Sequence, residues 1–418
     1  MKSYTELIIL GIFVNYLNYL IATMLNFVNL KSASYEKINQ YYSYLDYKKM
    51  SLYAQARSRA EIVAVFFSVV ALLAFWLFSG FRILDDFVRS LPTNFIFQSS
   101  VYLIIILTFF IILRLLYEIY LNFYLDKKYR ISRMKFKEFA IENAKRSLIY
   151  YIIAGIIAIS IFTSHILFGQ NFWWVAWIVA SILIISYSYL YPMIYLKFLN
   201  TINNAVDPNL RNKILNFCQE IDFPISNINI FESSKRTNRL NAFFAGFGKN
   251  KNIIISDSII NNFTDEEILA VIGHEAGHNK LNHNIANISI AIALIGIVLF
   301  LLSIFTTDIT IFKSFYVYNL SLYVGLALYS VLIASFSIVV LPLINYHLRK
   351  NEQRADEFSL NHTRNKDTYI SAITKVYKKN LYNPVPHPYY VFFYYKRNPA
   401  EQRIKYIENY FEKISENK

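Results

Sequence analysis

The sequence predicts an all-α polytopic membrane protein with seven transmembrane helices and a small β segment. Of its 418 residues, 55% are hydrophobic and only 17% are charged, whereas soluble domains average about 25% charged residues. Seven stretches are apolar over the length of about 20 residues that crosses the hydrocarbon core of a bilayer. The net charge is +14, and the Lys and Arg residues of the short loops are concentrated in alternate loops, as expected of a membrane protein.

The first predicted span is the weakest, because it contains Asn15 and Asn18. It lacks the basic start and small-residue cleavage site of a signal peptide, so we treat it as a span. Arg114 and Glu118 lie four residues apart on one face of the third span, which favours an ion pair; the alternative is the lining of a polar cavity. The seven predicted spans are 7–27, 62–81, 101–121, 148–167, 173–195, 285–305 and 322–344.

Basic residues in the connecting loops predict the orientation of these spans. Loops 31–60 and 122–147 carry six and eight Lys and Arg, whereas loops 81–100, 168–172 and 307–321 carry two, none and one. The two basic loops are therefore expected in the cytoplasm and the N-terminus outside. Segments 196–284 and 345–418 then also lie on the cytoplasmic side. Because the basic residues of the loops are distributed as expected for a membrane protein, we expect no nucleic-acid partner.

The longest polar segment between spans is 196–284, and its pattern alternates between short strands and a helix. Runs 227–231 and 252–255 are strand-like, and 233–239 reads as a polar loop. Thr264 and Glu267 form a capping box, in which each side chain binds the other residue's backbone N–H. The helix that starts there reaches His274-Glu275-Ala276-Gly277-His278.

This H-E-x-x-H pattern predicts a metal site. Residues four apart on a helix are separated by about 40° around its axis, so His274 and His278 can reach one ion. Glu275 can address a water beside that ion. The alternative is a histidine pair on a solvated helix. The single cysteine, Cys218, excludes a cysteine-rich zinc site.

Two segments compete to supply a third ligand. On a continuous helix, His283 would lie about 140° from His278, so we expect it beside the site or on the surface. Glu352 and Asp356 lie on one helix face beyond the seventh span, where Glu352 could bind zinc and Asp356 could orient a ligand imidazole. Spacing alone favours a solvated charged helix, but the shared cytoplasmic side of the two segments favours the metal site.

At this point the sequence resembles the type I CAAX prenyl proteases, which are membrane zinc metalloproteases. The resemblance covers nearly the whole chain. It is carried by His274-Glu-Ala-Gly-His278-Asn-Lys-Leu-Asn-His283, Arg349-x-x-Glu352-x-x-Ala355-Asp356, Ser234-Lys235-Arg236, Asn241-Ala242-Phe243, Tyr53-x-x-Ala56-Arg57-Ser58-Arg59, Phe123-Tyr-x-Asp126-Lys-Lys-Tyr129 and the segment from Pro192 to Asn200.

The resemblance implies a ring of seven helices around a water-filled chamber. Residues 1–195 would form an N-terminal membrane region with five spans and cytoplasmic loops. Residues 196–418 would form a gluzincin-like zinc protease region with the last two spans and the tail. It also implies one Zn²⁺ per chain on the cytoplasmic side, held by His274, His278 and Glu352, with Glu275 as general base, Asp356 orienting a ligand, and Asn241 and Ala242 binding the substrate backbone.

Two positions depart from the family pattern. Arg239 stands where many members have a His before the Asn-Ala pair. Near the C-terminus, Arg403 matches a family Arg, but Arg397 occupies the position of a His. Either arginine could then serve as the cation that stabilises the transition state.

These observations predict an integral-membrane zinc metalloendopeptidase that uses a zinc-activated water. By resemblance, its substrates are prenylated C-terminal tails, trimmed after the prenylated Cys. An alternative is a bacterial-type quality-control protease that degrades misfolded membrane proteins, and a distant alternative is a non-enzymatic transporter. We expect a multi-pass protein in contact with the lipid bilayer, in the inner (plasma) membrane of a bacterium or the endoplasmic reticulum membrane of a eukaryote.

Overall fold

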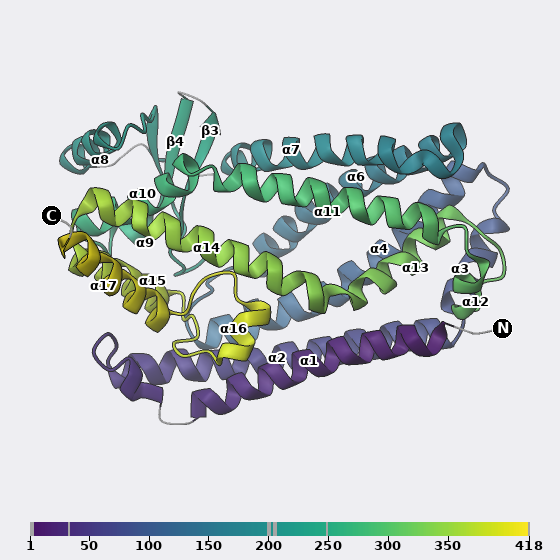
Figure 1. Ribbon diagram of the computed structural model, residues 1–418, viewed down its shortest axis with the longest axis horizontal. Helices are drawn as coiled ribbons and strands as arrows, with labels where there is room; N and C mark the ends of the chain where they lie inside the picture. The colour runs from purple at the N-terminus through teal and green to yellow at the C-terminus, as the bar shows by residue number, and fades with distance from the viewer. Residues whose placement is uncertain (1–3, 32–33, 199–201, 204–206, 248–249, 417–418) are drawn as a thin grey trace.

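A computed structural model describes residues 4–31, 34–198, 202–203, 207–247 and 250–416. Long helices lie side by side along the molecule, and a small sheet with the C-terminal helices gathers at one end (Figure 1). The long helices are α1 (Thr5–Lys31), α2 (Tyr44–Leu77), α4 (Phe95–Ile119), α6 (Phe136–Phe168), α7 (Phe172–Phe198), α11 (His283–Phe305), α13 (Leu322–Ser335) and α14 (Ser337–Thr363).

The predicted set of seven spans is confirmed. Among the described residues, five stretches are long and apolar enough to cross a membrane, and the bent pair α13 and α14 supplies a sixth crossing. One of the five, Phe136–Leu190, contains both α6 and α7. These two helices reverse at Gly169, whose φ of +56° suits a residue without a Cβ, and they pack against each other (Figure 1).

Several predicted loops are helical instead. Helix α2 begins at Tyr44, well before the predicted span, because the Ser43 side chain caps the N–H of Asp46. Helix α4 continues through the π-helical turn η2 (Tyr120–Leu125) into α5 (Asp126–Lys128). Hydropathy reports which part of a helix suits lipid, whereas capping and backbone propensity decide where the helix ends. Short helices also fill the other connections: η1 (Ser34–Lys37), α3 (Gly80–Arg89), η3 (Gly169–Asn171) and α12 (Ile309–Ser314).

The seventh predicted span is bent rather than straight. Helices α13 and α14 meet at Phe336 with an angle of 66° between them. The N–H of Val339 bonds the carbonyl of Phe336, so the carbonyl of Ser335 is free of its usual helical partner. Asn15 of α1 donates its side-chain amide to that carbonyl. Asn15, which makes the first predicted span the weakest, therefore donates the hydrogen bond that the bend in the last span removes from the Ser335 carbonyl.

The sheet has four strands in the order β1-β2-β4-β3. Strands β2 (Asn227–Phe231) and β4 (Asn250–Ser256) run parallel and confirm the two predicted strands. Strand β1 (Ile202–Asn203) pairs antiparallel with β2. Strand β3 (Ala242–Phe247) pairs antiparallel with β4, so it forms one edge of the described sheet.

Several amphipathic helices lie at the same end of the molecule as the sheet (Figure 1). A shared apolar core links the sheet to these helices through residues such as Phe217, Ile253, Ile272 and Ile373. Its members come from elements far apart in sequence, which fixes their mutual position. The helices are α8 (Pro208–Glu220), α9 (Asp257–Ile260), α10 (Asp265–Lys280), α15 (Lys366–Lys379) and α17 (Ala400–Glu416), whereas α16 (Pro388–Tyr394) packs against α14 and α1.

Candidate metal centre

Helix α10 begins as the sequence predicts. Glu267 accepts the Thr264 N–H at 2.8 Å, and the Thr264 hydroxyl accepts the Glu267 N–H at 3.3 Å, which completes the capping box. Glu267 is also buried and binds Lys375 and Ser371 of α15, each at 2.6 Å. The cap therefore fixes the start of α10 and attaches it to a second helix.

Two glycines let α10 and α14 approach closely. A Cβ on Gly273 would lie 2.6 Å from the Ser359 hydroxyl, and one on Gly277 would lie 3.1 Å from the Cα of Ala355. The Ser359 hydroxyl, in turn, donates to the carbonyl of Ala270 at 2.8 Å. Small residues four apart thus form a flat face on α10, as in closely packed helix pairs. The second helix consequently presents its carboxylates to the histidines of the first.

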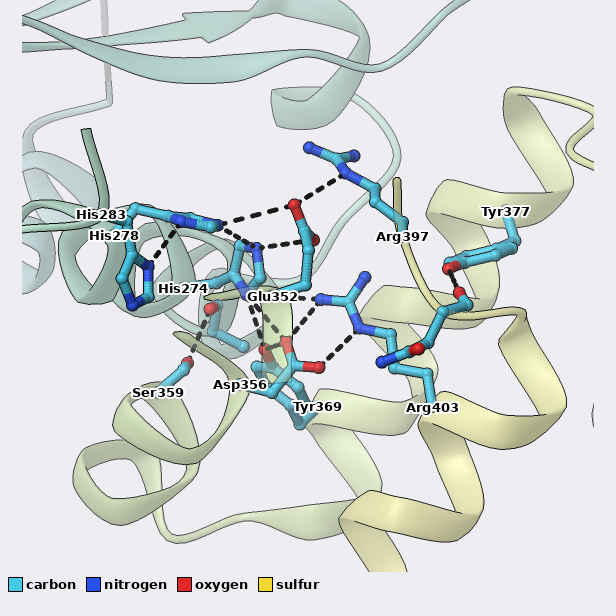
Figure 2. A network of polar contacts seen from close by, with 12 residues as sticks. His274, His278, His283, Glu352, Asp356, Ser359, Tyr369, Tyr377, Arg397 and Arg403 are labelled. Atoms are coloured by element: carbon cyan, nitrogen blue, oxygen red, sulfur yellow. Dashed lines mark hydrogen bonds and ion pairs between the residues drawn. The ribbon is translucent and has the colours of Figure 1, made fainter. Parts of the chain in front are cut away.

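The three predicted ligands come together at this contact (Figure 2). Glu352 Oε2 lies 3.6 Å from Nε2 of His274, and Glu352 Oε1 lies 3.7 Å from Nε2 of His278. The two Nε2 atoms are 3.2 Å apart. One ligand atom from each residue lies within 4.8 Å of the others. The sequence predicted this grouping from spacing and topology.

The donor set fits a zinc ion. Two imidazoles and a carboxylate are a ligand combination that catalytic zinc sites use, with a further position left open. Glu352 Oε2 is buried and lacks a hydrogen-bond donor among the described residues. A buried carboxylate oxygen without a donor is costly, and a cation between it and the imidazoles would satisfy it.

Asp356 contacts the Nδ1 side of the His274 ring, opposite the side that faces Glu352 (Figure 2). Its Oδ1 lies 2.8 Å from Nδ1 of His274 and accepts the hydroxyl of Tyr369 at 2.6 Å. Arg403 donates to both oxygens of Asp356, at 2.7 and 2.5 Å. The carboxylate is almost fully buried, and these donors satisfy it.

The electrostatic environment differs between the two histidines. Burial disfavours protonation of His274, but the carboxylates of Asp356 and Glu352 outweigh it and raise its pKa to about 9. Burial and the nearby charge of His274 lower the pKa of His278 to about 3. His278 is therefore neutral over the physiological range, the form in which imidazole binds metals.

His283 does not lie where a continuous helix would put it. Helix α10 ends at Lys280, and Asn282 adopts a left-handed conformation with φ +55°, so α11 starts in a new direction. His283 is buried, and its Nδ1 lies 3.0 Å from Nδ1 of His278. The expectation of a group beside the site is confirmed, and that of a surface residue is wrong. The angle argument failed because the helix breaks.

A pocket of about 420 Å³ opens beside His274. Its lining includes Glu275, Asn241 and Ala242, so the predicted base and the predicted substrate-binding residues face one space. Burial raises the pKa of Glu275, the direction expected for a carboxylate that acts as a general base. The two predicted arginines, Arg397 and Arg403, line the same pocket.

The arginines have different surroundings. Arg403 is buried and directs its donors to Asp356, and its Nη2 lies 3.3 Å from Nδ1 of His274. Arg397 is half exposed, and its Nε donates to Glu352 Oε1 at 3.0 Å. Arg397 is thus closer to open pocket space, whereas Arg403 supports the groups behind His274.

Tyr369 is a residue of the site that the sequence analysis missed. It belongs to α15, which carries no recognisable motif, and its hydroxyl lies 3.2 Å from Nδ1 of His274. The sequence places Tyr369 on the apolar face of an amphipathic helix, a position that is typical of a core residue.

Arg114 and Glu118 lie apart from the site and form the expected ion pair at 3.5 Å. Glu118 also contacts Arg146 at 3.1 Å.

Comparisons with known proteins agree with this geometry. Residues 204–410 match peptidase family M48, and residues 25–201 match the CAAX prenyl protease N-terminal region of five membrane helices. The probable CAAX prenyl protease 1 of Schizosaccharomyces pombe is 28% identical over 337 residues, covering 75% of this chain and 69% of the relative. The CAAX prenyl protease 1 homolog of Mus musculus is 24% identical and covers 87% of this chain and 86% of its own.

A solved structure extends the likeness to the fold. The crystal structure of S. mikatae Ste24p superposes with a TM-score of 0.90 at 19% identity, covering 98% of this chain and 100% of that one. At this identity the match speaks for the chamber fold of seven helices. With the two family matches spanning nearly all of its length, the chain belongs to peptidase family M48 and is an integral-membrane metalloprotease.

Proposed function

We propose that this protein is a zinc endopeptidase that hydrolyses peptide bonds with Glu275 as general base and His274, His278 and Glu352 as metal ligands. The observation that carries the proposal is the meeting of the three ligand atoms within 4.8 Å beside the pocket that Glu275 lines. Zinc in such a site polarises a substrate carbonyl and lowers the pKa of water to about 7.

The residues of this chain would divide the remaining work. Glu275 would take a proton from the attacking water and later deliver it to the leaving amine. Asp356 would hold His274 in one tautomer and orientation. Arg397 is the better placed cation for the oxyanion, because it borders the pocket and is half exposed. Arg403 would keep Asp356 ionised and oriented.

The edge strand β3 supports a way of binding substrate. Asn241 accepts the N–H of Ser256, so its backbone faces β4. Backbone groups alternate in direction along an antiparallel pair, and those of Ala242 therefore face away from β4. We infer that Ala242 binds the substrate backbone as an added strand, and that Asn241 contributes its exposed side-chain amide.

The named relatives support a proposal for the substrate class. Because two of them carry the name CAAX prenyl protease 1, we propose C-terminal tails of prenylated proteins as substrates, with misfolded membrane proteins as the second class to test. The basic loops support a cytoplasmic position for the site. We also propose the division at 195 and 196: residues 1–195 form the N-terminal membrane region with five spans, and residues 196–418 form the protease region, which contains the last two spans and every proposed ligand.

Glu275→Gln tests this function directly. The variant should retain zinc, because Glu275 is not among the proposed ligands, and should lose at least about 100-fold in turnover because the general base is absent. Zinc content is measured by mass spectrometry. Cleavage is measured with two substrates, a farnesylated C-terminal peptide and an unfolded membrane protein. Normal cleavage by a zinc-loaded Glu275→Gln protein would refute the assignment.

Glu352→Ala tests the ligand set. We expect this variant to lose zinc during dialysis, since two imidazoles alone hold the ion weakly. Unchanged metal content would point to a different third ligand. A transporter, by contrast, would move solute normally without any peptidase activity, so a metal assay combined with a peptidase assay separates the two functions.

A further inference from the structure

Three guanidinium groups line the pocket beside His274, against the single carboxylate of Glu275. Two of the three have partners within the metal centre. Arg403 donates twice to Asp356, and Arg397 donates to Glu352. The third, Arg239, has a different arrangement.

Arg239 is anchored by one nitrogen. Its Nη2 lies 3.1 Å from Asp126 Oδ2 and 3.2 Å from the hydroxyl of Tyr53, which itself donates to Asp126 Oδ1 at 2.7 Å. Asp126 and Tyr53 are buried, so they provide a rigid base. Among the described residues, the Nη1 and Nε donors of Arg239 bond no other group, and 42% of the side chain is exposed. Two charged donors therefore remain for a ligand in the pocket.

The position of Arg239 relative to β3 indicates which part of a substrate it meets. A strand added antiparallel to β3 runs toward its own C-terminus in the direction from Ala242 back to Arg239. Three residues of extended chain span about 10 Å. A group two or three residues beyond the substrate residue paired with Ala242 would thus lie beside Arg239.

We propose that Arg239 binds a substrate carboxylate on the C-terminal side of the residue that pairs with Ala242. This inference rests on the proposed peptidase function. The carboxylate has two sources: the free C-terminus of a short tail, or an acidic side chain at the same distance. A guanidinium with two free donors matches either one, because a carboxylate accepts two parallel N–H bonds.

The experiment uses the full-length, zinc-loaded protein in detergent and three fluorescent peptides. The first ends in a free carboxylate, the second is its C-terminal amide, and the third is an amide with a Glu near its end. We expect the free acid to be cleaved about 10- to 100-fold more efficiently than the plain amide, the range typical of a charge-assisted hydrogen bond. Recovery with the Glu peptide would assign the site to acidic side chains as well; no recovery would restrict it to C-termini.

Arg239→Gln should bring the ratio of acid to amide cleavage close to one, mainly by raising KM for the acid. Arg239→Lys should keep part of the preference. Arg236→Gln is the matched control, because Arg236 lies on the same loop and pairs with Glu142 at 2.6 Å but does not line the pocket. The control should keep the wild-type ratio.

Two results would overturn the proposal: equal cleavage of acid and amide by the wild type, or equal loss of preference in the Arg239 and Arg236 variants. Anisotropy of the same peptides on a Glu275→Gln background tests binding without turnover. If no peptide is cleaved, the peptidase function fails, yet a preference for the acid in binding that Arg239→Gln removes would still support the carboxylate site.

Discussion

Asp356 Oδ1 lies 2.8 Å from Nδ1 of His274, while Nε2 of the same ring faces Glu352 at 3.6 Å. One imidazole thus joins two carboxylates on the same helix, four residues apart. In the proposed metal site, the carboxylate at Nδ1 would hold the proton on that nitrogen and leave the lone pair of Nε2 for the metal. We therefore propose that the i,i+4 spacing of the two acids serves the metal site.

Asp356→Asn should weaken zinc affinity about 10- to 100-fold, the usual effect of removing a hydrogen-bond partner of a ligand. Competition with a chromogenic chelator measures the affinity. Glu357→Gln is the control, since Glu357 is the next residue on the helix and contacts Tyr406 rather than the metal centre. Equal affinities for Asp356→Asn and the wild type would exclude an orienting role.

The sequence alone was sufficient to predict which side chains lie close together where those residues belong to one regular helix. The spacing of His274 and His278 survives folding, because α10 is regular from its cap through both residues. Glu352 required topology in addition, because its partner helix lies beyond two spans. His283 could not be placed, since a left-handed residue at Asn282 redirects the chain. Arg397 and Arg403 were marked only by resemblance, and their different exposure appears only in three dimensions.

His283→Ala should weaken zinc affinity by about 10-fold, because Nδ1 of His278 would lose its partner at 3.0 Å. His283→Asn should recover part of the loss, as its amide offers a hydrogen-bonding group in a similar place. Zinc release rates after addition of a chelator are the readout. A role in packing alone predicts equal losses in both variants.

Gly277→Ala should separate α10 from α14. The added Cβ would lie 3.0 to 3.2 Å from Phe358 Cβ and the Ala355 backbone, tighter than ordinary contacts. We expect a cost of about 1–3 kcal/mol and weaker zinc retention, measured by thermal unfolding and metal content. Gly155→Ala is the control, because nothing lies within 4 Å of its Cβ position; there we expect a neutral or slightly stabilising effect. Wild-type melting and metal content in Gly277→Ala would show that the helices tolerate the methyl group.

Glu267→Gln should lower stability in a pH-dependent way. Burial would raise the pKa of Glu267, but Lys375, Ser371 and the Thr264 N–H outweigh it and lower the pKa. A carboxyl with a lowered pKa in the folded chain stabilises it above the unfolded value of about 4.3, and this contribution is lost as pH falls through the folded pKa.

The Tm of metal-free Glu267→Gln should therefore lie below that of metal-free wild type at pH 7, by an amount equivalent to about 1–3 kcal/mol. The difference between the two values should shrink as the pH falls through the lowered folded pKa of Glu267, because both side chains are neutral below it. Glu266→Gln is the control, since Glu266 is exposed and lies 3.7 Å from Lys213. A Tm difference that stays constant from pH 7 to pH 3 would contradict the linkage.

Asn15→Leu tests whether a polar residue in the first span supports the bend in the last. Leucine suits lipid better, yet it would leave the Ser335 carbonyl without the amide of Asn15 and the Ser337 hydroxyl without its acceptor at 2.9 Å. Hydrogen bonds between membrane helices contribute about 0.5–2 kcal/mol, so we expect a lower Tm despite the greater hydrophobicity. Because α14 carries Glu352, zinc loss to a chelator should also accelerate. Ser100→Ala, which removes a bond within its own helix, should leave both measurements unchanged. A higher Tm in Asn15→Leu would mean that the bend is maintained by packing alone.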